Sequence, residues 1–213
     1  ASDIAGSGHS INDFVDAASP VATIMPEQSV DFILVTEQGT VKRLKNGSFA
    51  KADGLSCMSV EGNDRIIFGA PILAETSVVL ATTNNQVLRT ATDKIRAQQR
   101  QGSGVTGIKL ADSAKVVAAG LHSDSSTLAI ATNTGSVKVT PTSLFPEKGR
   151  ATGGVRSTAL KKAETDITAA AVLPSSGALA WDNAAAKSEV LTTSEKTTTS
   201  PQPIGIENPA FFS

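Results

Sequence analysis

The chain has 213 residues, of which 40% are hydrophobic and 18% charged, and its formal net charge is −1. This composition is typical of a globular protein, and no apolar run approaches the roughly 18 residues that a membrane-spanning helix needs. No signal-peptide pattern is present and the single cysteine, Cys57, cannot form an intrachain disulfide, so we expect a cytoplasmic protein with a buried thiol.

The charge is distributed unevenly along the chain. Residues 1–41 carry six acids and no Lys or Arg, and residues 42–88 carry five bases and four acids. Residues 89–162 carry twelve bases and four acids, whereas residues 163–213 carry two bases and six acids. A basic block inside a neutral chain indicates a face that binds a polyanion; the alternative is ordinary solvated charge on the surface of the fold.

The N-terminal part of the chain precedes the regular pattern. Residues 1–19 are rich in Gly, Ser and Asp, and we expect a flexible leader there. The chain begins with Ala1 and not with Met, which favours a piece cut from a longer protein. One short apolar run, at residues 20–25, stands alone before the first repeat.

The stretch from Phe32 to Arg43 has the pattern of a buried strand, a tight turn and a second strand that ends on two cations. Weaker or similar copies begin at Val78, Leu128 and Leu179. The equivalent points in the four copies lie 46, 50 and 50 residues apart, at Thr36, Thr82, Thr132 and Asp182. This spacing is typical of repeat architectures built from blades of sheet.

Each copy continues into further short apolar runs. The third runs are residues 55–60, 105–110, 155–160 and, weakly, 204–206, and the fourth runs are residues 66–68, 116–119 and 167–172. The last copy lacks a fourth run, and the lone run at residues 21–24 fits that place. We therefore predict an all-β, propeller-like domain over residues 20–213, with about four four-stranded blades. We expect repeats near residues 30–70, 76–120, 126–173 and 177–206, the ring being sealed by pairing of the N- and C-terminal segments.

The hairpin turns have a recurring requirement for a positive φ. Gly39 and Gly135, with Asn85 between them, occupy the position in each turn that needs this conformation. Ala185 holds the same position in the fourth copy, where we expect an altered turn.

Nothing in the sequence predicts catalysis or metal binding. The stretch from Gly102 to Gly107 matches G-x-G-x-x-G, but it opens a strand and not the helix that a dinucleotide site requires. His9 and His122 have no partners at metal-ligand spacing. There is no G-x-S-x-G motif, and no pair of carboxylates has a spacing that suits an active site. We predict no catalytic residue, no metal and no cofactor in this chain.

The most informative stretch runs from Ala97 to Lys109. It resembles the Gly-rich basic box, Q-R-R-G-G-K-G, of the C-terminal domain of the DNA gyrase A subunit. Four residues of the box match, namely Gln98, Arg100, Gly102 and Gly104, and Gln99, Gln101 and Ser103 replace Arg, Gly and Lys. The hairpin at residues 36–43 resembles the T-x-x-G-x-x-K-R hairpin of that family, and residues 138–154 resemble its R-x-x-G loop. The resemblance covers about residues 20–190.

The resemblance implies a β-pinwheel, a propeller-like ring that binds duplex DNA around its basic perimeter. It implies a non-catalytic domain of the A subunit of a bacterial type IIA topoisomerase, either gyrase or topoisomerase IV, that is cytoplasmic and associated with the nucleoid. The implied partners are duplex DNA, the rest of the A subunit and the ATPase subunit. The catalytic Tyr, ATP and Mg²⁺ would lie outside this chain. Four repeats, a degraded box and a near-zero net charge favour weak DNA wrapping. The first alternative is a propeller that binds protein partners, and the second is a propeller enzyme or secreted adhesin.

Basic side chains on a rigid rim neutralise phosphates and release counterions, and this gives affinity without sequence information. The chain contains no Tyr and only 4% aromatic residues, so we expect binding to the backbone of a duplex and not stacking on single strands. The predicted DNA-binding residues are Lys42, Arg43, Arg89, Lys94, Arg96, Arg100, Lys138, Lys148, Arg150 and Arg156.

Overall fold

The computed structural model describes residues 30–48, 56–74 and 76–173 in full, together with the backbone of the strands at 178–182, 188–192 and 210–212. These residues form strands, turns and two short 3₁₀ helices, so the all-β prediction is confirmed. The described part of the chain contains no helix with the length and apolar character needed to cross a membrane.

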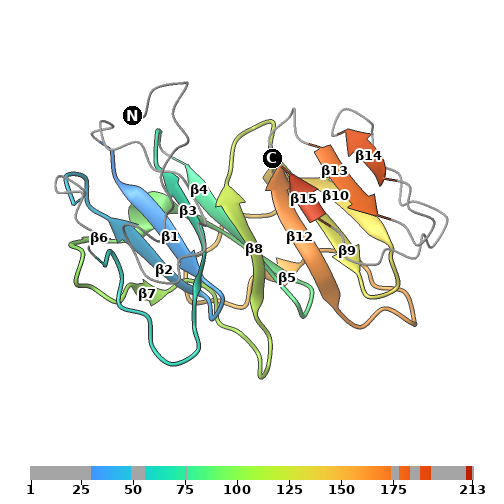
Figure 1. Cartoon of the computed structure of the whole chain (residues 1–213), viewed down its shortest axis with the longest axis horizontal. Helices are drawn as coiled ribbons and strands as arrows, with labels where there is room; N and C mark the ends of the chain where they lie inside the picture. The colour runs from blue at the N-terminus through green and yellow to red at the C-terminus, as the bar shows by residue number, and fades with distance from the viewer. Residues whose placement is uncertain are drawn as a thin grey trace, which may run out of the picture.

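Four sheets lie side by side along the molecule, from the blue first sheet to the red and orange fourth sheet at the other end (Figure 1). Each is built on an antiparallel hairpin, and a further strand pairs with the first strand of that hairpin. The first sheet contains β1 (Phe32–Thr36), β2 (Thr40–Leu44) and β3 (Ile66–Pro71). The second contains β4 (Ser77–Thr82), β5 (Gln86–Ala91) and β8 (Val116–Leu121). The third contains β9 (Thr127–Thr132), β10 (Val137–Pro141) and β12 (Ile167–Leu173). The fourth contains β13 (Ala178–Asp182), β14 (Ser188–Thr192) and β15 (Ala210–Phe212).

The third runs of the second and third repeats do not join the sheets of their own repeats, so the prediction that four consecutive runs build one blade is wrong for these two repeats. β6 (Ala97–Gln98) and β7 (Val105–Thr106), which belong to the second repeat, pair with β2 of the first. β11 (Val155–Arg156), from the third repeat, likewise pairs with β5 of the second. The physical reason is that the outer edges of β2 and β5 carry backbone groups that need partners, and the following repeat supplies them. Sequence periodicity locates a run but does not choose its partner.

The core lies between neighbouring sheets, which explains why all six residues of β4 are buried. Successive side chains of a strand point to opposite faces. Val78 and Leu80 therefore pack with the first sheet in one cluster, while Val79 and Ala81 pack with the third sheet in another. The inner strands β3, β8, β12 and β15 contact one another along the row. A single sheet would leave one of these apolar faces exposed to solvent, so the stability of each repeat depends on stacking against its neighbours.

The recurring threonines have a local role in the hairpins. The Thr36 Oγ1 accepts a hydrogen bond from the backbone N–H of Thr40 at 3.1 Å, and Thr82 and Thr132 make the equivalent bonds at 3.0 and 3.2 Å. The turn positions have the predicted positive φ, at 80° for Gly39, 64° for Asn85 and 81° for Gly135. Ala185 lies outside the described residues.

The last sheet corrects a second expectation. The position beside β13 is occupied by β15, with Leu179 opposite Phe211, so the last repeat does have its own fourth strand. The run Ala-Phe-Phe is only three residues long, too short to stand out as a strand in the sequence. Residues 21–24, which we predicted to fill that position, lie outside the described residues. Among the described strands, no pairing joins the first sheet to the fourth.

The contact between inner strands gives a test of the fold. Gly120, in β8, is buried, and a Cβ added there would collide with the Val172 side chain of β12. Gly120→Ala should lower the free energy of unfolding by about 1–3 kcal/mol, because overpacking forces side chains and backbone to shift. Urea denaturation followed by circular dichroism measures this loss.

Gly149→Ala is the matched control, since a Cβ at Gly149 meets nothing within 4 Å. It should leave the urea midpoint nearly unchanged. Equal effects of the two glycine substitutions would show that β8 and β12 do not pack as described.

Candidate nucleic-acid interface

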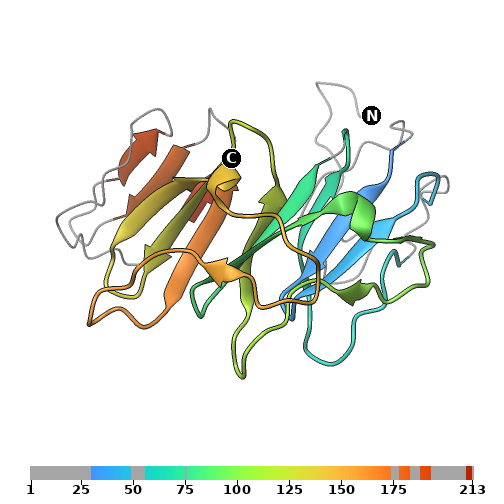
Figure 2. The ribbon, with the colours of Figure 1, turned by 180° about the vertical axis from the view of Figure 1, so that it is seen from behind.

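The connection that carries the Gly-rich stretch lies on the outer edge of the first sheet. β6 runs parallel to β2, with Arg43 opposite Ala97, and β7 returns antiparallel, with Val41 opposite Val105. Residues 99–104, here called the first rim loop, therefore arch beside β2. Figure 2 shows this connection and its equivalent in the next repeat crossing in front of the sheets.

The buried side chain of Lys42 holds the first rim loop in place. Its Nζ donates hydrogen bonds to the backbone oxygens of Cys57 at 2.7 Å, Arg100 at 2.7 Å and Gly102 at 2.6 Å. The residue has 0% exposure, and burial lowers the pKa of Lys42 while the nearby Cys57 acts in the opposite direction. Lys42 therefore cannot contact a phosphate, and its assignment as a DNA-binding residue is wrong. Adjacent strand residues point to opposite faces, so Lys42 and Arg43 could not both face solvent once the loop covered β2.

Three of the four matching box residues shape the loop. The Oε1 of Gln98 accepts a hydrogen bond from the backbone N–H of Gly104 at 3.1 Å. A Cβ on Gly102 would collide with the Gln98 side chain, and Gly104 has φ of 87° with Val41 O close to where its Cβ would be. Only a glycine combines this conformation with this approach. Arg100 is the one matching residue whose charged side chain is left for a ligand.

An equivalent loop lies fifty residues further on, at residues 149–154, here called the second rim loop. Arg150 corresponds to Arg100, and Gly154, with φ of 74°, corresponds to Gly104. The two loops are joined by the segment 106–109: the Lys109 N–H donates to Thr152 O at 2.9 Å, and Arg150 Nη1 donates to Thr106 O at 3.4 Å. The loops thus form one continuous surface along the outer edge of the first two sheets.

The structure separates the ten predicted residues into groups. Five are exposed on or beside the rim loops, and Arg100 is partly exposed there; the five are Lys94, Arg96, Lys148, Arg150 and Arg156. Lys94 lies in the 3₁₀ helix η2 (Thr92–Lys94) that leads to β6. The equivalent 3₁₀ helix η3 (Thr142–Leu144) precedes the second rim loop. Lys138 is partly buried on β10 of the third sheet.

Two further cations on this edge were missed in the sequence. Lys45 and Lys109 are exposed, and their backbone N–H groups donate to Gln98 O and Thr152 O at 2.9 Å each. The signal was available, because Lys45 lies two residues beyond Arg43 and Lys109 ends the Gly-rich stretch. The sequence does not show that the pairing of β6 and β7 with β2 brings both lysines beside the rim loops.

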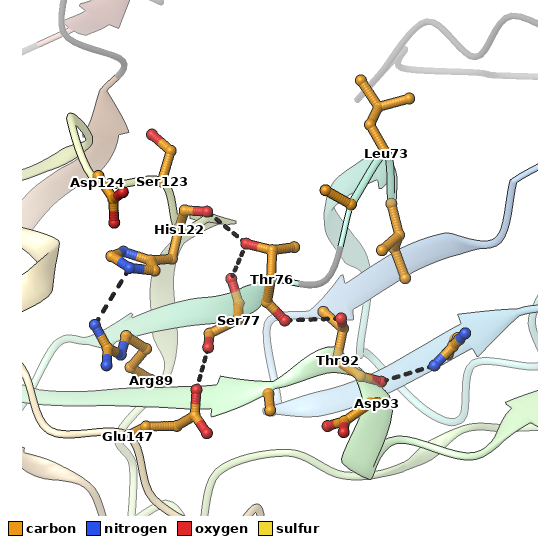
Figure 3. Close-up of a pocket in the computed structure, with 14 residues that line it drawn as sticks. Leu73, Thr76, Ser77, Arg89, Thr92, Asp93, His122, Ser123, Asp124 and Glu147 are labelled. Atoms are coloured by element: carbon orange, nitrogen blue, oxygen red, sulfur yellow. Dashed lines mark hydrogen bonds between the residues drawn. The ribbon is translucent and has the colours of Figure 1, made fainter.

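Arg43 and Arg89 line a cleft of about 810 Å³ between the first two sheets (Figure 3). Arg43 Nε donates to Asp31 Oδ2 at 2.7 Å, and Arg89 Nη1 donates to His122 Nε2 at 3.3 Å. Burial lowers the pKa of His122, and the positive charge of Arg89 lowers it further. The neutral ring then carries its proton on Nδ1, which lies 2.7 Å from Thr142 Oγ1.

The cleft is less suited to binding a phosphate than the two rim loops are. Three carboxylates also line it, from Asp93, Asp124 and Glu147, and they outnumber its two guanidinium groups. Within the described ranges, no group of three or more His, Cys, Asp or Glu residues is placed to hold a metal ion.

Comparisons with known proteins identify the family and the fold of the chain. A sequence model of the family described as the DNA gyrase C-terminal domain, a β-propeller, matches residues 31–72, 76–123 and 126–172. The DNA gyrase A protein of Klebsiella oxytoca is 32% identical over 133 residues, which are 62% of this chain and 15% of that protein. The equivalent gyrase protein of Salmonella typhimurium is 30% identical over 149 residues, which are 67% of this chain and 17% of that protein. The chain thus spans a small part of these relatives.

Solved structures share the fold at lower identity. The C-terminal domain of DNA topoisomerase IV superposes with a TM-score of 0.74 at 20% identity, over 87% of this chain and 61% of that one. The C-terminal domain of DNA gyrase A gives a TM-score of 0.61 at 17% identity, over 76% of this chain and 55% of that one. With the family match over more than half of its length, this chain belongs to the DNA gyrase C-terminal domain family of β-propellers.

Proposed function

We propose that the outer edge of the first two sheets binds duplex DNA, and that the chain is a non-catalytic domain of a type IIA topoisomerase A subunit that presents DNA for strand passage. The observation that carries the proposal is the pair of rim loops, which repeat an arginine at a spacing of fifty residues on one continuous surface. The positive sign of these charges suits the phosphates of a duplex.

The charges on the rim are available to a ligand. Among the described residues, Arg96, Arg100, Lys148, Arg150 and Arg156 form no ion pair within 4.0 Å, whereas Lys94 has Asp93 at 3.8 Å. Two cations away from the rim loops are engaged, since Arg65 and Lys115 both pair with Glu37, at 3.1 and 3.2 Å. Uncompensated cations on a rigid surface bind phosphates without the loss of an existing partner.

The mode of binding follows from what the surface lacks. Within the fully described ranges, the exposed large hydrophobic residues are Val60, Leu73 and Leu144, and no aromatic ring is among them. Single-strand binding relies on aromatic rings that stack on bases, whereas duplex binding relies on phosphate contacts. The rim therefore suits the backbone of a duplex with little preference for sequence.

We expect weak wrapping, as in a topoisomerase IV-like or divergent gyrase protein. Gln99, Gln101 and Ser103 are exposed on the first rim loop and uncharged, where the gyrase-type box has two cations and a glycine. Each missing cation removes about one phosphate contact. A parent enzyme with this domain would relax or decatenate DNA better than it supercoils it.

Duplex binding should weaken steeply with salt. If about five phosphates are neutralised, the logarithm of the binding constant should fall with the logarithm of salt concentration with a slope near −4 to −5. Fluorescence anisotropy with a labelled duplex measures this slope. Arg150→Gln should make it shallower by about 0.9, and Arg65→Gln, which removes a cation paired with Glu37, should leave it unchanged. A slope near zero, or equal effects of the two substitutions, contradicts the proposal.

Restoring the gyrase-type box should strengthen wrapping. Gln99→Arg, Gln101→Gly and Ser103→Lys together should steepen the salt slope by about two, because two cations are added. The linking-number change trapped when a nicked circle is closed in the presence of the protein should also grow. Asn63→Arg with Ala163→Lys adds the same charge in exposed turns before β3 and β12, and should change both quantities less. A native chain that already traps a large linking-number change would overturn weak wrapping.

A further inference from the structure

We propose that Lys42 is the positioning residue of the first rim loop: its buried ammonium holds the loop in the shape that presents Arg100 to a phosphate, although Lys42 itself never touches DNA. This inference rests on the proposed DNA-binding function and adds to it a residue that acts from inside the fold.

The ammonium group is matched to its surroundings. It has three N–H donors and makes three short hydrogen bonds, to the carbonyls of Cys57, Arg100 and Gly102. No carboxylate in the described residues lies within 4.0 Å of it. A buried cation is tolerated only when its hydrogen bonds are satisfied, and here the rim loop supplies two of the three acceptors. The loop and the ammonium therefore depend on each other.

The two loop carbonyls lie at the functional part of the loop. Arg100 is the partly exposed cation of the loop, and Gly102 follows it by two positions. Holding both carbonyls fixes the backbone from which the guanidinium projects. A loop that is ordered before binding loses less conformational freedom on binding, and this raises affinity without adding a contact.

The second rim loop offers an internal comparison. The residue equivalent to Lys42 in the second sheet is Leu88, which has no donor. That loop is held instead by backbone contacts, in which the Ala151 N–H donates to Gly107 O and the Lys109 N–H donates to Thr152 O. Arg100 and Arg150 thus occupy equivalent places, but only Arg100 depends on a buried lysine.

A double-mutant cycle separates positioning from direct contact. Lys42→Met should weaken duplex binding, and in that background Arg100→Gln should no longer change the salt slope, although it makes the slope of the native chain shallower by about 0.9. Arg150→Gln should keep its full effect in both backgrounds. If Lys42 contacted phosphate directly, Lys42→Met and Arg100→Gln would each remove about 0.9 and add together, and this result would overturn the proposal.

Chemical rescue tests whether the three carbonyl oxygens around the Lys42 ammonium hold the loop. Lys42→Ala removes three carbons and the nitrogen, so n-propylammonium has the right length and the three donors to refill the space. It should restore the Arg100-dependent part of binding, whereas tetramethylammonium at the same ionic strength, which has no N–H donor, should not. Equal effects of the two cations would show that only ionic strength matters. This result would contradict the role of the three carbonyl acceptors.

Limited trypsin digestion tests the loop without DNA. Lys42→Met should speed cleavage after Arg100 and leave cleavage after Arg150 unchanged, while circular dichroism confirms that both proteins are folded. Unchanged cleavage after Arg100 would show that Lys42 does not hold the loop. If the native chain bound no duplex, the proposed function would fail, yet this digestion would still decide whether the loop depends on Lys42.

Discussion

The exchange of outer strands between repeats is the constraint on which the rest of the structure depends. β7 completes the sheet of the first repeat and β11 that of the second, so neither sheet has its full set of strands until the next repeat is in place. Stacked inner strands alone would leave the outer edges of β2 and β5 unpaired, an arrangement that proteins avoid. Pairing across repeats covers these edges and joins neighbouring sheets through the backbone as well as through the core.

The same exchange creates the candidate interface. The chain crosses to the preceding sheet through η2 or η3. Each rim loop then turns between two segments that both pair with the outer strand of that preceding sheet. Their glycines serve close backbone approach, as Gly104 does against Val41 and Gly154 against Val87. Arg150 is exposed and Arg100 partly exposed, while the buried Lys42 and the joining segment 106–109 hold the loops in place. Stability and DNA binding thus share the same segments, and a substitution in the rim has to be judged for both.

Local patterns predicted much of this fold, because they depend on neighbouring residues. The hairpins, the threonines at the turns and the positive φ of Gly39, Asn85 and Gly135 were all readable from spacing and residue type. Long-range pairing was not, since the partner of the run at residues 105–110 depends on which edge is free in three dimensions. Lys42 was misjudged for the same reason: alternation indicates that a strand residue changes face, but not that a loop from the next repeat covers it. The carboxylates that face Arg43 and the cleft come from segments as distant as Asp31 and Glu147, a proximity that only the fold creates.

The most direct test of the account is protection of lysines by duplex DNA, measured by acetylation and mass spectrometry on the whole chain. The account predicts that Lys94, Lys109 and Lys148 are protected when a duplex is added, because they lie on the rim. Lys115 and Lys161, which pair with Glu37 and Glu164, should react equally with and without DNA. Lys42 should stay unmodified in both cases, since it is fully buried. Protection of Lys115 and Lys161 without protection of the rim lysines would place the duplex elsewhere and contradict the account.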